Sequence, residues 1–196
     1  MKPEKPIPLP RSYIPDHLRS EVKTMLIGEW QIAHRVKELA HGIVEDFRDK
    51  DLVVVSLLNG TVMFLADLIR EISMPMHLDF IGVSSYGSGT TSRELVYTKD
   101  LRLDVKGRDV LLLDDILDTG RTLKDVSGKL EKLDPRTIKT CVLLDKPDRR
   151  AEEVQADYVG FEVPDFFVVG YGLDFAERYR NLPFIGVLKP EMYQDA

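Results

Sequence analysis

The order of apolar and polar residues along the chain predicts alternating strands and helices. Between residues 32 and 47, apolar side chains recur every three or four positions, which is the spacing of one helix face. The same spacing returns in two later segments, at 62–72 and at 122–133. Continuous apolar runs are typical of strands buried on both sides of a parallel sheet, and they occur at 51–58, 77–85, 109–115 and 137–145. We therefore predict consecutive βαβ units in an α/β fold with a parallel sheet.

Three other segments lack this pattern. Five prolines crowd residues 1–15, so we expect a tail that is extended or loosely attached. Residues 86–98 are polar and contain Gly87 and Gly89, which predicts a long mobile excursion between two strands. Residues 156–180 contain short strand-like pieces separated by proline and glycine, typical of a small lobe over the sheet edge. We call this lobe the hood, expect residues 160–196 to contribute to it, and expect residues 1–196 to form a single domain.

Composition narrows the class of protein. The chain has 196 residues, 43% hydrophobic and 31% charged, which are ordinary values for a globular protein. Its net charge of -6 disfavours unspecific binding to nucleic acid or to an anionic membrane. Its start has no apolar middle like that of a secretion signal, so we expect a cytoplasmic protein. Cys141 is the only cysteine and reads as a small buried strand residue, and the four histidines show no metal-ligand pattern.

The most informative segment is residues 110–122, where an apolar strand runs into acidic residues and a hydroxyl-rich turn before a helix. Ligands of open α/β sheets bind outside the carboxyl ends of the strands, so this segment is placed where a site is expected. Asp114 and Asp115 could accept hydrogen bonds from ribose hydroxyls or hold a magnesium ion. The turn could enclose a phosphate through backbone N–H groups and hydroxyls, and it comprises Asp118, Thr119, Gly120, Arg121 and Thr122. A solvated strand end with a helix cap explains only part of this pattern.

Residues 111–122 resemble the signature of type I phosphoribosyltransferases, in which an apolar strand, two acidic residues and two apolar residues precede D-T-G-x-T. Asp114 stands where many purine enzymes of the family have glutamate. The resemblance implies the type I phosphoribosyltransferase fold, a twisted parallel sheet flanked by helices with a small hood. It also implies that residues 114–122 bind the phosphoribosyl group of phosphoribosyl pyrophosphate. Asp118 would manage the proton on N7 of a purine, by accepting or stabilising it.

The base is suggested by residues 143–146 and 160–174, which are similar to segments of hypoxanthine-guanine phosphoribosyltransferases. This similarity implies that Lys146 donates to the purine 6-oxo group, that Phe167 stacks on the ring and that Val168 contacts it through its backbone. An ammonium group distinguishes a carbonyl oxygen from the amino group of adenine. Asp174 would hold Mg²⁺, the implied cofactor, together with Asp114 and Asp115.

The pyrophosphate side of the site matches the family less closely. Leu58, Asn59 and Gly60 stand where the family usually has leucine, lysine and glycine, so one positive charge is lost at Asn59. By resemblance, Arg180 would contact pyrophosphate, although an ion pair with Glu177 at helical spacing is the ordinary alternative. The family's mobile loop, which closes over the reacting centre, carries a serine-tyrosine pair that matches Ser85 and Tyr86.

These features predict an enzyme of purine salvage that uses phosphoribosyl pyrophosphate and hypoxanthine or guanine. The resemblance also implies a homodimer or homotetramer. Two alternatives stay open: a nucleotide-sensing RNA-binding regulator on the same fold, and an enzyme of the family that prefers xanthine. The net charge and Lys146 argue against the RNA-binding regulator, whereas nothing in the sequence separates the purines that differ at position 2.

Overall fold

A computed structural model describes residues 2–86 and 94–193 of the chain. Its helices are α1 (Glu29–Asp46), α2 (Val62–Glu71) and α3 (Arg121–Glu131). Its strands are β1 (Val22–Ile27), β2 (Leu52–Leu58), β3 (His77–Tyr86), β4 (Glu94–Lys99), β5 (Asp109–Leu117), β6 (Thr137–Asp145), β7 (Tyr158–Glu162), β8 (Val168–Val169) and β9 (Ile185–Leu188).

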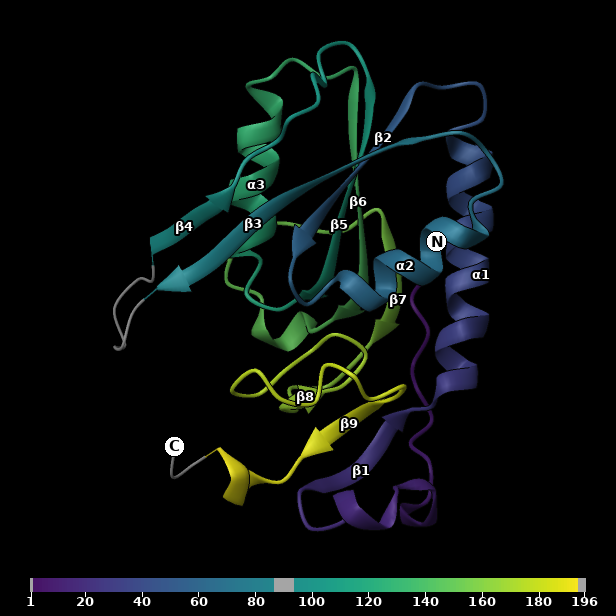
Figure 1. The fold of residues 1–196 in the computed structure, drawn as a ribbon, viewed down its shortest axis with the longest axis vertical. Coiled ribbons are helices and arrows are strands. Elements are labelled where there is room, and N and C mark those ends of the chain that lie inside the picture. The colour runs from purple at the N-terminus through teal and green to yellow at the C-terminus, as the bar shows by residue number, and fades with distance from the viewer. Residues whose placement is uncertain (1, 87–93, 194–196) are drawn as a thin grey trace.

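The main sheet has six strands in the order β4-β3-β2-β5-β6-β7. All neighbouring pairs are parallel except β3 and β4, which are antiparallel. Helices α1 and α2 cover one face and α3 covers the other (Figure 1). The predicted α/β class with a parallel, helix-flanked sheet is confirmed.

The alternation of side chains along the strands divides the core into two layers. Val54, Leu111 and Cys141 pack with the apolar residues of α1 and α2, whereas Val53 and Leu112 pack with those of α3. Both sides of the central strands are therefore buried, which explains why their sequences are continuously apolar. Cys141 is fully buried, as its apolar surroundings in the sequence predict. None of the helices in the part of the chain that the structure describes combines the length and the apolar character needed to cross a bilayer.

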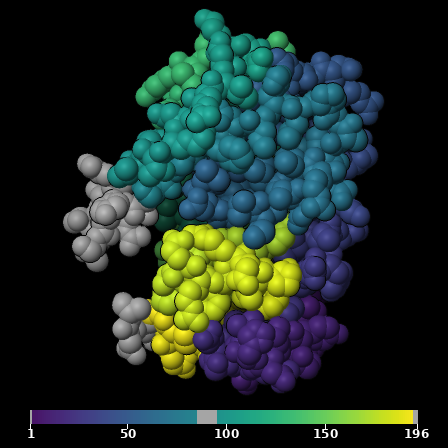
Figure 2. Space-filling model, viewed as in Figure 1, coloured from purple at the N-terminus to yellow at the C-terminus, as the bar shows by residue number. Residues whose placement is uncertain are grey.

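The hood is a three-stranded antiparallel sheet in the order β1-β9-β8. It lies beyond the carboxyl ends of the central strands, and its N-terminal and C-terminal segments are in contact there (Figures 1 and 2). The pairing of β1 with the hood was not expected from the sequence. Residues 160–162, which we expected in the hood, are part of β7 at the edge of the main sheet. Short strands such as β1 are specified by a distant partner more than by their own pattern.

The proline-rich tail is attached to the fold, so the expectation of a loose tail is wrong. The backbone N–H of Glu4 donates to Gly160 at 3.1 Å, and the N–H of Leu9 donates to Met25 at 2.9 Å. Ile14 is completely buried. Prolines lack an N–H donor, but the residues between them supply the donors that hold the tail in place.

Part of the predicted mobile excursion is a strand. Glu94–Lys99 forms β4, which pairs with β3, so nearly half of residues 86–98 belongs to the sheet. The only apolar residues of this edge strand are the adjacent Leu95, Val96 and Tyr97, a run too short to be recognised as a strand in the sequence. Gly87 and Gly89 lie outside the described residues.

Candidate active site

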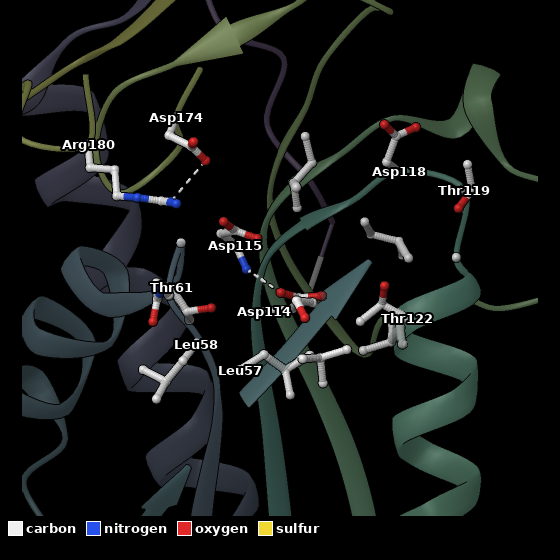
Figure 3. A pocket seen from close by; sticks show the side chains of 18 of the residues that line it. Leu57, Leu58, Thr61, Asp114, Asp115, Asp118, Thr119, Thr122, Asp174 and Arg180 are labelled. Atoms are coloured by element: carbon white, nitrogen blue, oxygen red, sulfur yellow. Dashed lines mark hydrogen bonds and ion pairs between the residues drawn. The ribbon is translucent and has the colours of Figure 1, made fainter. Parts of the chain in front are cut away.

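A cavity of about 490 Å³ lies between the carboxyl ends of the main strands and the hood (Figure 3). Most of the residues predicted to bind phosphoribosyl pyrophosphate line it, namely Leu58, Asn59, Gly60, Asp114, Asp115, Asp118, Thr119, Gly120, Thr122, Asp174 and Arg180. Arg121 is the exception in the turn. Its exposed side chain lines a separate surface hollow together with Lys124 and Glu152.

The turn before α3 has the geometry of an anion site. Gly120 is the N-cap of α3 and has a φ of 88°, in the left-handed region that glycine adopts at little cost. A Cβ at this position would lie 2.5 Å from Cγ1 of Val154, so a side chain there would also collide with the neighbouring loop. The first turn of a helix leaves N–H groups without intrahelical partners, and its positive dipole end favours an anion. Thr119 and Thr122 add hydroxyls on the same side of the cavity.

Asp114 and Asp115 form an adjacent acidic pair near the end of β5. The backbone N–H of Asp115 donates to Oδ1 of Asp114 at 3.0 Å. Asp114 is only 8% exposed, and burial together with the charge of Asp115 raises its pKa well above the ordinary value. Burial also raises the pKa of Asp115. The pair therefore holds concentrated negative charge with little solvent, an arrangement that favours a proton or a cation beside it.

Two glycines let the walls of the cavity approach one another closely. A Cβ on Gly60 would lie 1.7 Å from Oδ2 of Asp115, and a Cβ on Gly172 would lie 1.9 Å from the carbonyl oxygen of Gly60. Gly172 also has a φ of 100°. The loop after β2 is thus packed between the acidic pair and the hood. The peptide bond between Leu58 and Asn59 in this loop is cis.

Arg180 reaches the cavity from the hood. Its Nη1 lies 3.0 Å from Oδ1 of Asp174 (Figure 3). The same nitrogen donates to the carbonyl oxygen of Gly172 at 2.9 Å. Its Nη2 donates to Oε2 of Glu177 at 3.1 Å. The ion pair with Glu177 therefore exists alongside the position at the cavity. The expected helical spacing is wrong, because these residues form turns in which Glu177 has a φ of 61°.

A second cavity of about 490 Å³ adjoins the first and shares Ile116, Asp118 and Asp174 with it. Lys146 lines this second cavity and is 6% exposed. Its Nζ donates to the carbonyl oxygen of Phe166 at 2.6 Å. Burial lowers the pKa of Lys146, although the carboxylates of Asp118 and Asp165 oppose that shift. A buried ammonium beside a cavity is suited to a ligand carbonyl.

The aromatic wall of the second cavity is built from the hood. Phe167 is 37% exposed and lines the cavity next to Val168, which is buried in β8. The Phe167 ring stacks on Tyr193, with ring centroids 4.7 Å apart and planes 18° apart. Phe175 meets Phe167 edge to face, with centroids 5.5 Å apart. The two cavities together therefore join an anion-binding end to an aromatic end.

Comparisons with known proteins show the family to which the chain belongs. The model of the phosphoribosyl transferase domain family matches residues 28–176. The hypoxanthine-guanine phosphoribosyltransferase of Bacillus subtilis is 46% identical over 178 residues, which are 90% of this chain and 99% of that protein. This chain belongs to the phosphoribosyl transferase domain family.

Solved structures and a longer relative extend the comparison. The crystal structure of a hypoxanthine phosphoribosyltransferase from Staphylococcus aureus superposes with a TM-score of 0.87 at 44% identity, covering 92% of this chain and 98% of that one. The bifunctional protein TilS/HprT of Listeria monocytogenes is 43% identical over 181 residues. Those residues are 92% of this chain, but the chain spans only 28% of the length of that relative.

The carboxylates of this family member fit a magnesium ion only in part. Asp114, Asp115 and Asp174 line the same cavity and offer the hard oxygen donors that Mg²⁺ prefers. Within residues 2–86 and 94–193, however, no three His, Cys, Asp or Glu side chains are close enough to hold a metal by themselves. This set fits an ion that keeps waters and takes further oxygens from substrate phosphates.

Several side chains at the site were not found from the sequence. Arg149 donates from Nε to Oδ1 of Asp118 at 3.1 Å, and Asp165 lies 3.6 Å from Nη1 of Arg149. Tyr193 also lines the second cavity. Arg149 follows Lys146 by three residues in a charged segment after β6, which is the only local signal that could have pointed to it.

The residues predicted for the mobile loop are described only by their backbone. Ser85 and Tyr86 are the last residues of β3, and their amides pair with β4 opposite Leu95 and Glu94. Their side chains lie outside what the structure describes.

Proposed function

We propose that this chain transfers the phosphoribosyl group of phosphoribosyl pyrophosphate to hypoxanthine or guanine, giving IMP or GMP and pyrophosphate, a reaction of purine salvage. The observation that carries the proposal is the shared wall of the two cavities, in which Asp118 faces both. One cavity is rich in anion-binding and acidic groups and the other has an ammonium and an aromatic ring. A sugar phosphate and a purine bound in them would meet at Asp118.

The phosphoribosyl group would occupy the first cavity. Thr119, Gly120 and Thr122 would hold the 5′ phosphate at the start of α3, where unpaired N–H groups and the helix dipole favour it. Arg121 would contribute its backbone N–H there, because its side chain points to another hollow. Asp114 and Asp115 would accept hydrogen bonds from the ribose hydroxyls.

The purine would occupy the second cavity. Lys146 would donate to the 6-oxo group, Phe167 would stack on the ring and Val168 would offer backbone groups to the edge of the base. Lys146 already donates to the carbonyl oxygen of Phe166 and has room for further acceptors, since an ammonium carries three protons. The amino group of adenine would give it no acceptor in the same place.

Asp118 would manage the N7 proton. As the carboxylate accepts or stabilises that proton, electron density shifts toward N9, which attacks C1 of the ribosyl group. The bond from C1 to the pyrophosphate oxygen breaks, and pyrophosphate leaves with the bonding electrons. The transition state resembles a ribosyl cation, so closure of the loop that carries Ser85 and Tyr86 would exclude water as a competing nucleophile.

Leu58, Asn59, Gly60 and Arg180 would face the pyrophosphate. Asp174, with Asp114 and Asp115, would hold Mg²⁺ through its water and phosphate ligands, and the ion supplies positive charge against the departing pyrophosphate. Arg180 is positioned by Asp174 and Gly172, so its guanidinium is oriented before the substrate binds.

Steady-state rates with phosphoribosyl pyrophosphate, Mg²⁺ and each of hypoxanthine, guanine, xanthine and adenine test the proposal. Turnover of hypoxanthine or guanine, with little turnover of adenine, is the expected result. A much higher kcat/KM for xanthine would favour the xanthine-preferring alternative. Specific gel-shift binding to an RNA leader, without turnover of any purine, would favour the RNA-binding alternative and refute the proposal.

We further propose that residues 1–196 work as one cytoplasmic phosphoribosyltransferase domain that assembles as a homodimer or homotetramer. The pairing of β1 with β9 supports a single unit, because these two strands of the hood are more than 150 residues apart in the sequence. Light scattering on the purified protein measures the assembly.

A further inference from the structure

The turn that follows β9 brings Tyr193 to the purine cavity. The backbone N–H of Leu188 donates to the carbonyl oxygen of Phe167 at 2.8 Å, and that of Lys189 donates to Glu21 at 2.9 Å. A short turn at Pro190–Met192 follows, in which the N–H of Tyr193 donates to Pro190 at 3.1 Å. The position of Tyr193 is therefore set by backbone hydrogen bonds to both neighbouring parts of the hood.

Tyr193 stacks on Phe167 and packs with a hydrophobic cluster of the hood that is separate from the main-sheet core. Successive residues of a strand face opposite sides, and β8 follows this rule. Val168 packs in the cluster that reaches Ile116 and the main sheet, whereas Val169 packs in a separate cluster of the hood. Tyr193 packs against the cluster of Val169. Its ring thus supports one face of Phe167 from the hood.

The cavity stays open with Tyr193 in this position. It keeps a volume of about 490 Å³, within the usual range of small-molecule sites, with Lys146 and Asp118 on its main-sheet side.

We propose that Tyr193 is a positioning residue of the purine site, which holds the Phe167 ring in the plane that the purine stacks on. This inference rests on the proposed function, because it assigns the base to the second cavity. Phe167 is more than one-third exposed and has an edge contact with Phe175, so without Tyr193 its ring would lose its only stacked partner among the described residues. Freedom of that ring would weaken binding of the base and leave binding of phosphoribosyl pyrophosphate unchanged.

The test compares the KM for hypoxanthine with the KM for phosphoribosyl pyrophosphate in wild type, Tyr193→Ala and Tyr193→Phe. Loss of the stacking energy between Tyr193 and Phe167 should raise the KM for hypoxanthine of Tyr193→Ala by roughly two- to ten-fold. The KM for phosphoribosyl pyrophosphate should stay within about two-fold, because a lost contact of this kind acts on the base alone. Tyr193→Phe keeps the ring and should behave as wild type.

Two further variants control the test. Tyr13→Ala makes the same change at an exposed tyrosine that lines neither cavity, and both KM values should match wild type. Tyr193→Leu keeps apolar bulk without a ring face, so it serves if the alanine variant unfolds, and it should raise the KM for hypoxanthine in the same way.

Three outcomes would overturn the inference: an unchanged KM for hypoxanthine, a lower one, as expected if Tyr193 blocked the site, or an equal rise in both KM values. If the wild-type protein turned over no purine, the proposed function would be refuted instead. Calorimetry with GMP would then test the inference, because Tyr193→Ala should bind GMP roughly two- to ten-fold more weakly than wild type. Equal affinity of the two proteins for GMP would overturn the inference.

Discussion

Arg149 donates from its Nε to Oδ1 of Asp118 at 3.1 Å, across a sequence separation of 31 residues. The carboxylate of Asp118 in turn raises the pKa of Arg149, so the guanidinium stays charged. Asp165 continues the series of alternating charges, 3.6 Å from Nη1 of Arg149 and 3.9 Å from Nζ of Lys146. The two groups proposed to meet the purine at N7 and at the 6-oxo oxygen are thereby connected through one arginine and one aspartate.

Asp118→Asn should lower kcat by roughly 10²- to 10⁴-fold, because an amide cannot take up the N7 proton. The partly exposed position at the start of a turn predicts little change in the melting temperature. Asp148→Asn removes an exposed carboxylate that lines neither cavity and should keep full activity. Near-normal turnover of Asp118→Asn in a purine assay would remove Asp118 from its assigned role.

Arg149→Gln should lower kcat/KM for hypoxanthine by roughly two- to five-fold, the effect of a partly exposed ion pair. Oδ1 of Asp118 would lose its partner and the carboxylate would turn more freely. Arg149→Lys keeps the charge but loses the directed Nε donor, so it should fall between wild type and the glutamine variant. Raising the salt concentration should shrink the difference between wild type and Arg149→Gln, and a difference independent of salt would contradict an ionic role.

Lys146→Gln should lower kcat/KM for hypoxanthine by roughly 10- to 100-fold, because a hydrogen bond from a charged donor is lost. Any low activity with adenine should change less. Burial lowers the pKa of Lys146, so as the pH rises this ammonium should lose its proton at a lower pH than an ordinary lysine does. The wild-type rate with hypoxanthine should therefore fall on the alkaline side, and a pH-rate profile should show that this fall is absent in Lys146→Gln.

Asn59→Lys should lower the KM for phosphoribosyl pyrophosphate by roughly two- to five-fold, because it adds one charge at the rim of an anion site. Asn59 is exposed and lines the first cavity, so a longer side chain has room. Asn59→Gln lengthens the side chain without a charge and should leave the KM unchanged. An equal effect of both variants would assign the change to size.

The parts of the fold that could be predicted from the sequence are those whose pattern is local. The strand and turn of residues 110–122 can be recognised in the sequence, because a buried strand, an acidic pair and the start of a helix follow one another without interruption. Helix α1 was equally clear, since Ile32, Val36, Leu39 and Ile43 on its predicted apolar face are almost completely buried. In both cases the pattern that marks the element lies within a few consecutive positions, although its buried side chains pack against distant parts of the chain.

The parts that could not be predicted depend on distant partners. β1 is a strand because it pairs with β9, and β8 has only two residues, too few for any periodicity. Arg149 and Tyr193 reach the site through the fold of their segments and not through a motif. A hydrophobic pattern reports that a face is buried, but it does not identify what covers it.

Asp79→Asn should lower the free energy of unfolding by about 1.5–3 kcal/mol at pH 7, the usual value of hydrogen bonds to a charged group. Asp79 on β3 is 5% exposed and accepts hydrogen bonds from the N–H groups of Arg102 at 2.6 Å and Leu103 at 2.9 Å, and from Nζ of Lys99 at 3.0 Å. Burial opposes its ionisation, but these donors outweigh burial and hold its pKa well below the ordinary value.

The sign of the pH dependence follows from that depressed pKa. The carboxyl of Asp79 in the unfolded chain titrates near pH 3.9. Below about pH 4 it is therefore protonated in the unfolded chain while it stays ionised in the folded chain. The stabilisation by Asp79 is lost as the pH falls. Urea unfolding at pH 7, 4 and 3 should therefore show a difference between wild type and Asp79→Asn that shrinks with acidification. Asp104→Asn, at an exposed position, should cost little at any of these pH values. A difference for Asp79→Asn that stayed constant from pH 7 to pH 3 would mean that the charge of Asp79 does not stabilise the fold.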